Sequence, residues 1–303
     1  MSQLYPDFRS GHLELTAARD SATPVRIPYV TGGTGPPLLL LHGAPQTHAI
    51  WHKVAPALAQ HFTVVATDLR GYGDASKPDG GADHAGYSKR AMAADQVDVM
   101  RHLGHSRFRL AGHDRGGRVA HRLALDHPQA VERMMLLDIS PTLTMYERTT
   151  MAFATAYYHW FFLIQPAPYP EELIAANPEV FLRRHMGNRH GGLAVFSSGA
   201  FAEYLRCIRD AGTVHAICED YRAAATIDLE HDRADLAAGR KLSVRLRVLW
   251  GKHGVIERCF SALDDWREVS DSDVNGRALD CGHYIPEEAP EELTREMLAF
   301  FRA

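Results

Sequence analysis

The sequence LAGHDRGG at residues 110–117 decides the fold. An apolar run at 108–111 leads into it, and a helical pattern over 118–125 follows it. Because glycines stand on both sides of Asp114, at 112 and 116, this stretch predicts a strand, a sharp turn and a helix, with Asp114 at the turn. The alternative is that Asp114 only caps the following helix. The surrounding pattern favours the first interpretation.

The rest of the chain alternates short apolar runs with helical segments. Apolar runs at 37–41, 63–67 and 134–137, with a helical pattern over 88–103, predict an α/β protein whose mostly parallel sheet is flanked by helices. The strand pattern stops after Pro141 and returns only at 247–250 and 277–279. A final amphipathic helix is expected from about Pro290.

The long stretch without strands indicates an insertion into this sheet. It is rich in aromatic residues and has a helix-like pattern throughout. We therefore predict a core domain formed by residues 1–140 and 241–303, with an inserted helical cap domain at 141–240. The cap would lie over the carboxyl edge of the sheet, which is where open α/β sheets bind ligands.

Composition and charge argue against several other classes of protein. The 303 residues include 33 Lys and Arg against 37 Asp and Glu, which gives a net charge of −4 without a block of like charge. Binding to nucleic acid or to a membrane is therefore not expected. The four cysteines are far apart and the N-terminal segment lacks an apolar run, so we expect a protein of the cytoplasm.

An aspartate at the turn favours a particular class of reaction. A serine alkylated at carbon would become an ether, which activated water does not cleave, whereas an alkylated carboxylate becomes an ester that water can hydrolyse. Asp114 therefore indicates displacement at an sp³ carbon, such as halide loss or epoxide opening. Such a reaction needs no metal and no cofactor, and we expect neither.

The second half of the reaction needs a base, and His283 is the candidate. It follows the last predicted strand, which fits the chain order of nucleophile, acid and histidine known for this kind of turn. The acid that orients His283 is expected to be Asp138, because it ends the strand at 134–137 while the loop after 247–250 has no carboxylate before Glu257. Glu257 is the alternative.

Main-chain and cationic groups near Asp114 complete the predicted site. The N–H groups of Ala44 and Arg115 would hold the oxyanion that forms when the ester is hydrolysed. Arg115 and Arg118 share a helix face and would hold the carboxylate of an acidic substrate by forked hydrogen bonds. The alternative for these arginines is a surface ion pair, for example with Asp126. The functional interpretation predicts a small anionic substrate.

From about residue 25 onward, the sequence resembles the fluoroacetate (haloacetate) dehalogenases of the α/β-hydrolase fold. The residues that carry the resemblance are HGAPQ at 42–46, DLRGYGDASKP at 68–78, GHDRGGR at 112–118, LLDISP at 136–141, HW at 159–160, QPAP at 165–168, CEDYRAAA at 218–225 and GHYIPEEAP at 282–290. Epoxide hydrolases share HGxP and DLRGYG. The specific part is the combination of the Asp-Arg-x-x-Arg motif, the His-Trp pair and the CEDYR segment.

The resemblance implies hydrolytic dehalogenation of a short 2-haloacid, such as conversion of fluoroacetate to glycolate and halide. It implies Asp114 as the nucleophile, His283 as the base and Asp138 as the partner of that base. It also implies that Arg115 and Arg118 bind the carboxylate of the substrate. Related enzymes suggest a homodimer.

The resemblance further assigns His159, Trp160 and Tyr221 to the leaving halide. Fluoride forms strong hydrogen bonds, so N–H and O–H donors in a dry pocket would stabilise its developing charge. The sequence alone places these three residues in an aromatic core. Family members often carry a bulky Phe where this chain has Ala44, and some carry a cap Trp near 184–190, where no aromatic residue lies here. We therefore expect a roomier pocket, with larger or less fluorine-selective 2-haloacids as substrates.

Two other functions stay open. An epoxide hydrolase would use the same Asp-His-Asp triad, with Tyr221 and either Tyr157 or Tyr158 protonating the epoxide oxygen. Arg115 argues against it, because many epoxide hydrolases have Trp after the nucleophile. A non-catalytic protein that binds small acids is the second alternative, and an intact triad makes it the least favoured.

Overall fold

The structure is a computed structural model that describes residues 4–15 and 24–303, so the first three residues of the N-terminal segment considered above lie outside it. Within this part, the strands form one eight-stranded sheet in the order β1-β2-β4-β3-β5-β6-β7-β8. β2 pairs antiparallel with β1 and β4, and the other neighbours are parallel. The strands are β1 (Arg9–Leu15), β2 (Val25–Gly32), β3 (Pro37–Leu41), β4 (Thr63–Thr67), β5 (Phe108–His113), β6 (Val131–Leu137), β7 (Arg245–Gly251) and β8 (Val274–Leu279).

The structure confirms the predicted α/β-hydrolase fold with its mostly parallel sheet. Each strand predicted from an apolar run is present, from β3 to β8, and most extend beyond the run. The sequence pattern missed β1 and β2. β1 is an edge strand whose residues are exposed or half-buried, and β2 contains Pro28, so neither forms a continuous apolar run.

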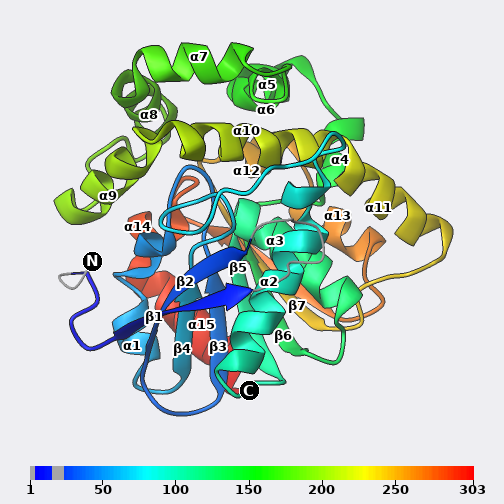
Figure 1. Cartoon of the computed structure of the whole chain (residues 1–303). Coiled ribbons are helices and arrows are strands. Elements are labelled where there is room, and N and C mark those ends of the chain that lie inside the picture. The colour runs from blue at the N-terminus through cyan, green and yellow to red at the C-terminus, as the bar shows by residue number, and fades with distance from the viewer. Residues whose placement is uncertain (1–3, 16–23) are drawn as a thin grey trace.

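Helices cover both faces of the sheet (Figure 1). Because successive side chains of a strand point to opposite faces, Leu38 and Leu40 join the core cluster beneath α1 and α15, whereas Leu39 and Leu41 join the cluster beneath α2 and α3. The helices of this core are α1 (Ala55–Leu58), α2 (Lys89–His102), α3 (Arg115–Asp126), α12 (Val255–Cys259), α13 (Ala262–Glu268), α14 (Ile285–Glu288) and α15 (Pro290–Arg302), with 3₁₀ turns η1 (His48–Trp51) and η2 (Ala85–Tyr87).

The chain between β6 and β7 is helical, as predicted, and α5 to α10 lie above the sheet in Figure 1. We call residues 141–240 the cap; that they form a separate domain stays a prediction. Its helices are α4 (Thr142–Glu147), α5 (Met151–Ala156), α6 (Tyr158–Phe162), α7 (Tyr169–Ala176), α8 (Pro178–Gly187), α9 (Ser198–Ile208), α10 (Ala211–Ala225) and α11 (Ile227–Ala237). None of the helices in residues 4–15 and 24–303 is long and apolar enough to cross a membrane.

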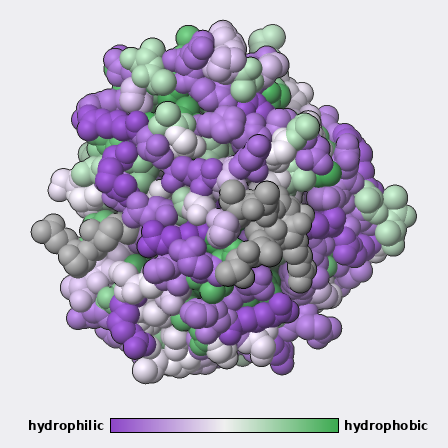
Figure 2. Space-filling view, viewed as in Figure 1, coloured by the Kyte–Doolittle hydropathy of each residue, from purple (hydrophilic) through white to green (hydrophobic). Residues whose placement is uncertain are grey.

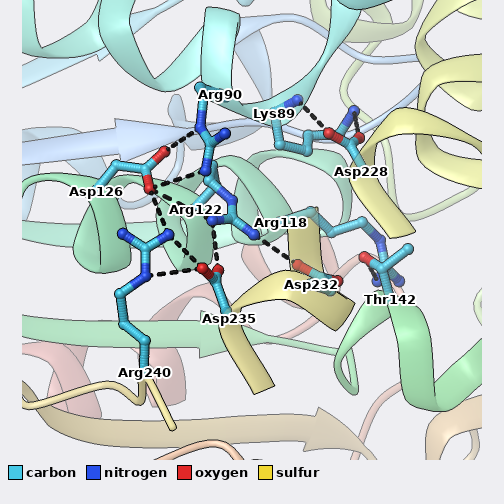
Figure 3. A network of polar contacts seen from close by, with 10 residues as sticks. All are labelled: Lys89, Arg90, Arg118, Arg122, Asp126, Thr142, Asp228, Asp232, Asp235 and Arg240. Carbon is cyan, nitrogen blue, oxygen red and sulfur yellow. Dashed lines mark hydrogen bonds and ion pairs between the residues drawn. The ribbon is translucent and has the colours of Figure 1, made fainter. Parts of the chain in front are cut away.

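Ion pairs and hydrogen bonds attach the last cap helix, α11, to α2 and α3 (Figure 3). Arg122 of α3 donates to Asp235 at 2.6 Å and to Asp232 at 2.7 Å, both on α11. The main-chain N–H of Lys89, at the start of α2, donates to Asp228 of α11 at 2.8 Å. Removing one partner from buried pairs of this kind leaves an uncompensated charge. The contacts therefore fix the cap against the helix that follows the turn at 114.

Candidate active site

Asp114 lies between β5 and α3 in a strained backbone conformation. Its φ of 49° and ψ of −115° fall outside the regions that most residues adopt. Gly116 is required beside it, because a Cβ there would lie 2.4 Å from the carbonyl oxygen of His42. The Asp114 side chain makes no capping hydrogen bond to α3. The interpretation of Asp114 as a mere helix cap is therefore wrong, and the turn presents its carboxylate.

The carboxylate of Asp114 is buried but charged. The main-chain N–H of Ala44 donates to its Oδ1 at 3.0 Å. Burial alone would raise the pKa of Asp114, but electrostatic interactions with His283 and His113, followed by those with Arg118 and Arg115, lower it to about 2. Asp114 is therefore an anion at neutral pH, which is the state that a nucleophilic displacement requires.

His283 and Asp138 form a dyad that faces Asp114. His283 lies between β8 and α14, and its Nδ1 is 2.6 Å from Oδ2 of Asp138, which directly follows β6. The Nε2 of His283 is 3.9 Å from Oδ2 of Asp114. Glu257, the alternative acid, instead accepts a hydrogen bond from the indole N–H of Trp250. The geometry thus brings Asp138 to the histidine and keeps Glu257 away from it.

One of the two predicted main-chain donors contacts the nucleophile, and the other belongs to the residue that follows it. The N–H of Ala44 already contacts the carboxylate, and the Ala44 loop can approach because residue 43 is glycine: a Cβ there would lie 2.5 Å from Cβ of Asp114. Arg115 is the first residue of α3, where a main-chain N–H has no acceptor inside the helix. Both N–H groups are therefore suited to hold an oxygen of the Asp114 side chain when negative charge develops on it.

Arg115 and Arg118 are both buried, so the alternative of a surface ion pair with Asp126 is wrong. Asp220 of α10 binds Arg115 through Nε at 2.8 Å and Nη2 at 2.9 Å. Arg118 donates to Oγ1 of Thr142 at 2.9 Å (Figure 3). Among the described residues, Nη1 of Arg115 and Nε of Arg118 are buried without a hydrogen-bond partner. Each guanidinium thus retains a donor for a ligand.

The positive charge of these arginines is only partly neutralised. Asp220 pairs with Arg115, while the contacts of Arg118 are to neutral oxygen and sulfur atoms. Burial and the neighbouring charge of Arg115 lower the pKa of Arg118 to about 10, although Asp114 acts in the opposite direction. An anionic ligand beside Arg118 would remove this unfavourable interaction.

Two of the three residues assigned to halide lie over the two arginines, and the third, His159, lies 5.8 Å from Tyr221 between ring centres. The guanidinium of Arg115 lies 4.2 Å from the ring centre of Tyr221, and that of Arg118 lies 4.6 Å from the ring centre of Trp160. Within the described residues, the indole N–H of Trp160 is buried without an acceptor. Burial and nearby positive charges lower the pKa of His159, so its ring is neutral at pH 7 and donates one N–H.

A cleft of about 820 Å³ opens beside this group of residues. His159 and His283 belong to its lining, whereas Asp114 and the arginines at 115 and 118 do not. His283 links the cleft to the nucleophile, because its Nε2 lies 3.9 Å from Oδ2 of Asp114. The site is closed from bulk water, which strengthens electrostatic interactions inside it.

Comparison with known proteins places this geometry in a family. Residues 36–185 match the family of the alpha/beta hydrolase fold. The chain is 45% identical over 277 residues to a fluoroacetate dehalogenase from Burkholderia sp, a match that covers 91% of this chain and 90% of that protein. The chain belongs to the α/β-hydrolase family. The broader part of the resemblance seen in the sequence is thereby confirmed.

Other relatives of this α/β hydrolase differ in the activity that their names state. A soluble epoxide hydrolase from Corynebacterium sp. (strain C12) is 35% identical over 292 residues, which cover 95% of this chain and 98% of that protein. A solved structure assigned as an α/β hydrolase from Nostoc sp PCC 7120 shares 53% identity with a TM-score of 0.92 and covers 98% of each chain. The protein is therefore a hydrolase, and its relatives include a fluoroacetate dehalogenase and epoxide hydrolases.

The sequence analysis of this α/β hydrolase missed the role of Asp220. This buried carboxylate accepts hydrogen bonds from Arg115, from the hydroxyl of Tyr72 and from the ammonium of Lys89. It joins the arginine beside the nucleophile to the ion pairs that attach α11. The feature of the sequence that could have found it is an acidic residue directly before Tyr221. The segment that contains both residues forms α10, which is buried along most of its length.

Replacing Asp220 by Asn is expected to destabilise the fold by about 3 kcal/mol or more, because Arg115 would keep a buried charge without a counterion and Lys89 would keep only its pair with Asp228. The free energy of unfolding, measured by urea denaturation at pH 7.5, checks this value. The matched control is Asp264→Asn, which breaks an exposed pair with Arg267 and is expected to cost less than about 1 kcal/mol. Equal losses in the two variants would contradict a structural role for Asp220.

Proposed function

We propose that this α/β hydrolase removes halide from short 2-haloacids, such as fluoroacetate or chloroacetate, and releases a 2-hydroxy acid. The observation that carries the proposal is an ionised aspartate at the turn between β5 and α3, beside two buried arginines that retain N–H groups without a hydrogen-bond partner. A carboxylate nucleophile suits displacement at carbon, and paired guanidiniums suit a substrate carboxylate. The 45% identity to a fluoroacetate dehalogenase supports the same class of substrate.

The first step forms an ester on Asp114. Arg115 and Arg118 hold the substrate carboxylate, and a carboxylate oxygen of Asp114 attacks the carbon that bears the halogen. As the new C–O bond forms, the carbon–halogen bond breaks and its electron pair leaves with the halide, so the configuration at this carbon inverts. The indole N–H of Trp160, with donors of His159 and Tyr221, would stabilise the charge that develops on the halide.

The second step hydrolyses that ester. The Nε2 of His283 takes a proton from water, and the water oxygen attacks the carbonyl carbon of the Asp114 side chain. The N–H groups of Ala44 and Arg115 hold the oxyanion, and Asp138 stabilises the imidazolium. The bond between that carbonyl carbon and the substrate oxygen then breaks, the proton moves from His283 to this oxygen, and the 2-hydroxy acid leaves.

Trapping the ester tests the proposal. His283→Asn removes the base and leaves Asp114 in place, so incubation with chloroacetate is expected to add one carboxymethyl group to the protein. Mass spectrometry of the intact protein and of the peptide containing residue 114 checks this result. Incubation with acetate, which has no leaving group, is the control. A correctly folded variant that releases no halide and gains no mass would overturn the proposal.

An epoxide hydrolase is the second candidate, and the position of Tyr157 favours it. The hydroxyl of Tyr157 is buried 3.4 Å from Nδ1 of His283, whereas Tyr158 is half exposed. Tyr157 and Tyr221 would then protonate an epoxide oxygen while Asp114 attacks carbon. Assays of diol formation from styrene oxide and of halide release from chloroacetate separate the candidates. Turnover of the epoxide alone would favour the second.

A further inference from the structure

Among the described residues, the cleft of about 820 Å³ beside the active site is lined by basic side chains and by no acidic side chain. Three arginines and five histidines contribute to its wall, and no Asp or Glu belongs to the lining that the structure describes. These residues come from the cap around α6 and α8, from α12 and the core segment before it, and from the loop between β8 and α14. The charge of this wall comes from the three arginines, because burial lowers the pKa of His159 and His185 and His253 is paired with Asp280. Cations without acids in a concave wall concentrate the opposite sign, so the cleft attracts anions. The basic residues are Arg184, Arg189, Arg258, His159, His185, His190, His253 and His283.

The arginines of the cleft have no counterion of their own. Among the described residues, no carboxylate oxygen lies within the ion-pair distance of 4.0 Å from Arg184, Arg189 or Arg258. On the neighbouring surface of the cap, by contrast, Arg183 and Arg209 both bind Glu179 at 2.8 Å. The absence of acids is therefore a property of the cleft and does not extend to the whole cap.

Arg189 is the arginine of the cleft that stacks on a tyrosine next to the base. Its guanidinium lies 4.5 Å from the ring centre of Tyr157, whose hydroxyl is 3.4 Å from Nδ1 of His283. Burial alone would lower the pKa of Arg189, but Tyr157, Tyr284 and the charge of Asp114 raise it. Arg189 is thus a permanent cation that stands beside the base and is half-buried at the inner end of the cleft.

The volume of the cleft exceeds what a haloacetate needs. A space of about 820 Å³ is in the range that holds molecules several times larger. Arg115 and Arg118, outside this lining, are already suited to the carboxylate that neighbours the halogen. A substituent on the halogen-bearing carbon that extends into the cleft would meet its basic residues, Arg189 among them. A roomier pocket is what the sequence predicted from Ala44 and from the lack of an aromatic residue at 184–190.

We propose that Arg189 binds a second carboxylate of the substrate, so that 2-halodicarboxylates such as 2-chlorosuccinate are preferred over monocarboxylates of the same length. This inference rests on the proposed function, because it places the first carboxylate at Arg115 and Arg118. The second carboxylate would accept hydrogen bonds from the N–H groups of Arg189. Because this position is half-buried, such charge-assisted hydrogen bonds are stronger than on the surface. Arg184 and Arg258 would draw the dianion into the cleft without selecting its length.

A binding experiment tests the second carboxylate site without any turnover. Calorimetry compares succinate with butyrate, which replaces one carboxylate by a methyl group. We expect succinate to bind about tenfold more tightly to the wild type, and Arg189→Gln to reduce that preference to about twofold or less. Arg189→Lys, which keeps the charge, is expected to restore part of it. The charge-matched control is Arg107→Gln. Arg107 directly precedes β5, at the amino end of the parallel strands and away from the cleft, so this variant is expected to leave the preference unchanged.

Turnover provides the second readout. In the wild type, kcat/KM for 2-chlorosuccinate is expected to exceed that for 2-chlorobutanoate about tenfold, and Arg189→Gln is expected to remove the difference while chloroacetate turnover stays within about threefold. Equal affinities for succinate and butyrate, or a preference that survives Arg189→Gln, would overturn the inference. An equal loss of kcat/KM for all anionic substrates in Arg189→Gln would overturn the inference as well, because Arg189 would then attract anions without binding the second carboxylate. Halide release from chloroacetate reports separately on the proposed function, so each proposal can fail alone.

Discussion

Replacing Asp114 by Asn is expected to lower halide release by about 10⁴-fold or more, because a neutral amide does not displace halide from carbon. The substitution preserves the shape of the side chain, and its amide oxygen can still accept from the N–H of Ala44. Asn also tolerates a positive φ better than most residues, so the strained turn at 49° is retained. A halide electrode measures the rate, and urea denaturation verifies that the variant is folded.

The loss should come from the first step alone. Asp114→Asn is expected to show no burst of halide and no gain in mass with chloroacetate, even when His283 is also replaced by Asn. A folded Asp114→Asn variant that works within about tenfold of the wild type would refute nucleophilic attack by residue 114. It would point instead to direct attack by a water molecule that His283 activates.

The parts of the fold that could be predicted are those in which local pattern and burial coincide. Strands β3 to β7 lie inside a mostly parallel sheet that is covered on both faces, so they contain continuous apolar runs, whereas β8 is the other edge strand and showed only the short pattern at 277–279. The missed strands, β1 and β2, pair antiparallel at the edge and carry half-buried or exposed positions, so their sequence resembles a loop. Their pairing depends on contacts between strands, and the local pattern does not report such contacts.

The candidate site divides in the same way. Asp114, Asp138 and His283 each follow a parallel strand, and the carboxyl ends of such strands converge, so chain order alone brought these residues together in the prediction. A place for Arg115 in the site was also predicted, because this residue directly follows the turn. Its partner Asp220 was not, because it lies 105 residues further along on a cap helix whose position over the sheet no local pattern specifies.

Arg189 was missed for a related reason. The sequence analysis noted only that its segment lacks an aromatic residue, and a roomier pocket was the whole conclusion. That Arg189 stacks on Tyr157 beside His283 depends on how the end of α8 and the residues after it lie against α5 and α6. The charge of the cleft likewise arises from residues of the cap and the core that are distant in the chain.

Replacing Asp138 by Asn is expected to lower kcat by about 10³- to 10⁴-fold, because the base would lose the partner that sets its tautomer. Oδ2 of Asp138 accepts from Nδ1 of His283 at 2.6 Å, and Oδ1 accepts from the N–H of Gly251 at 2.9 Å. An amide has one oxygen for these two donors. If that oxygen keeps the bond to Gly251, its NH₂ group faces Nδ1, and the ring proton moves to Nε2, where it blocks proton uptake from water.

The timing of halide release distinguishes this effect from a general loss of structure. Attack by Asp114 does not use His283 as a base, so Asp138→Asn is expected to release about one halide per active site rapidly and then to stall as the ester. The control is Glu257→Gln, which alters an exposed carboxylate bonded to Trp250 and is expected to keep kcat within about twofold. A slow Glu257→Gln variant beside a fully active Asp138→Asn variant would show that the wrong acid had been assigned. A slow Asp138→Asn variant without the initial release would show that the substitution disturbs the nucleophile rather than the hydrolysis of its ester.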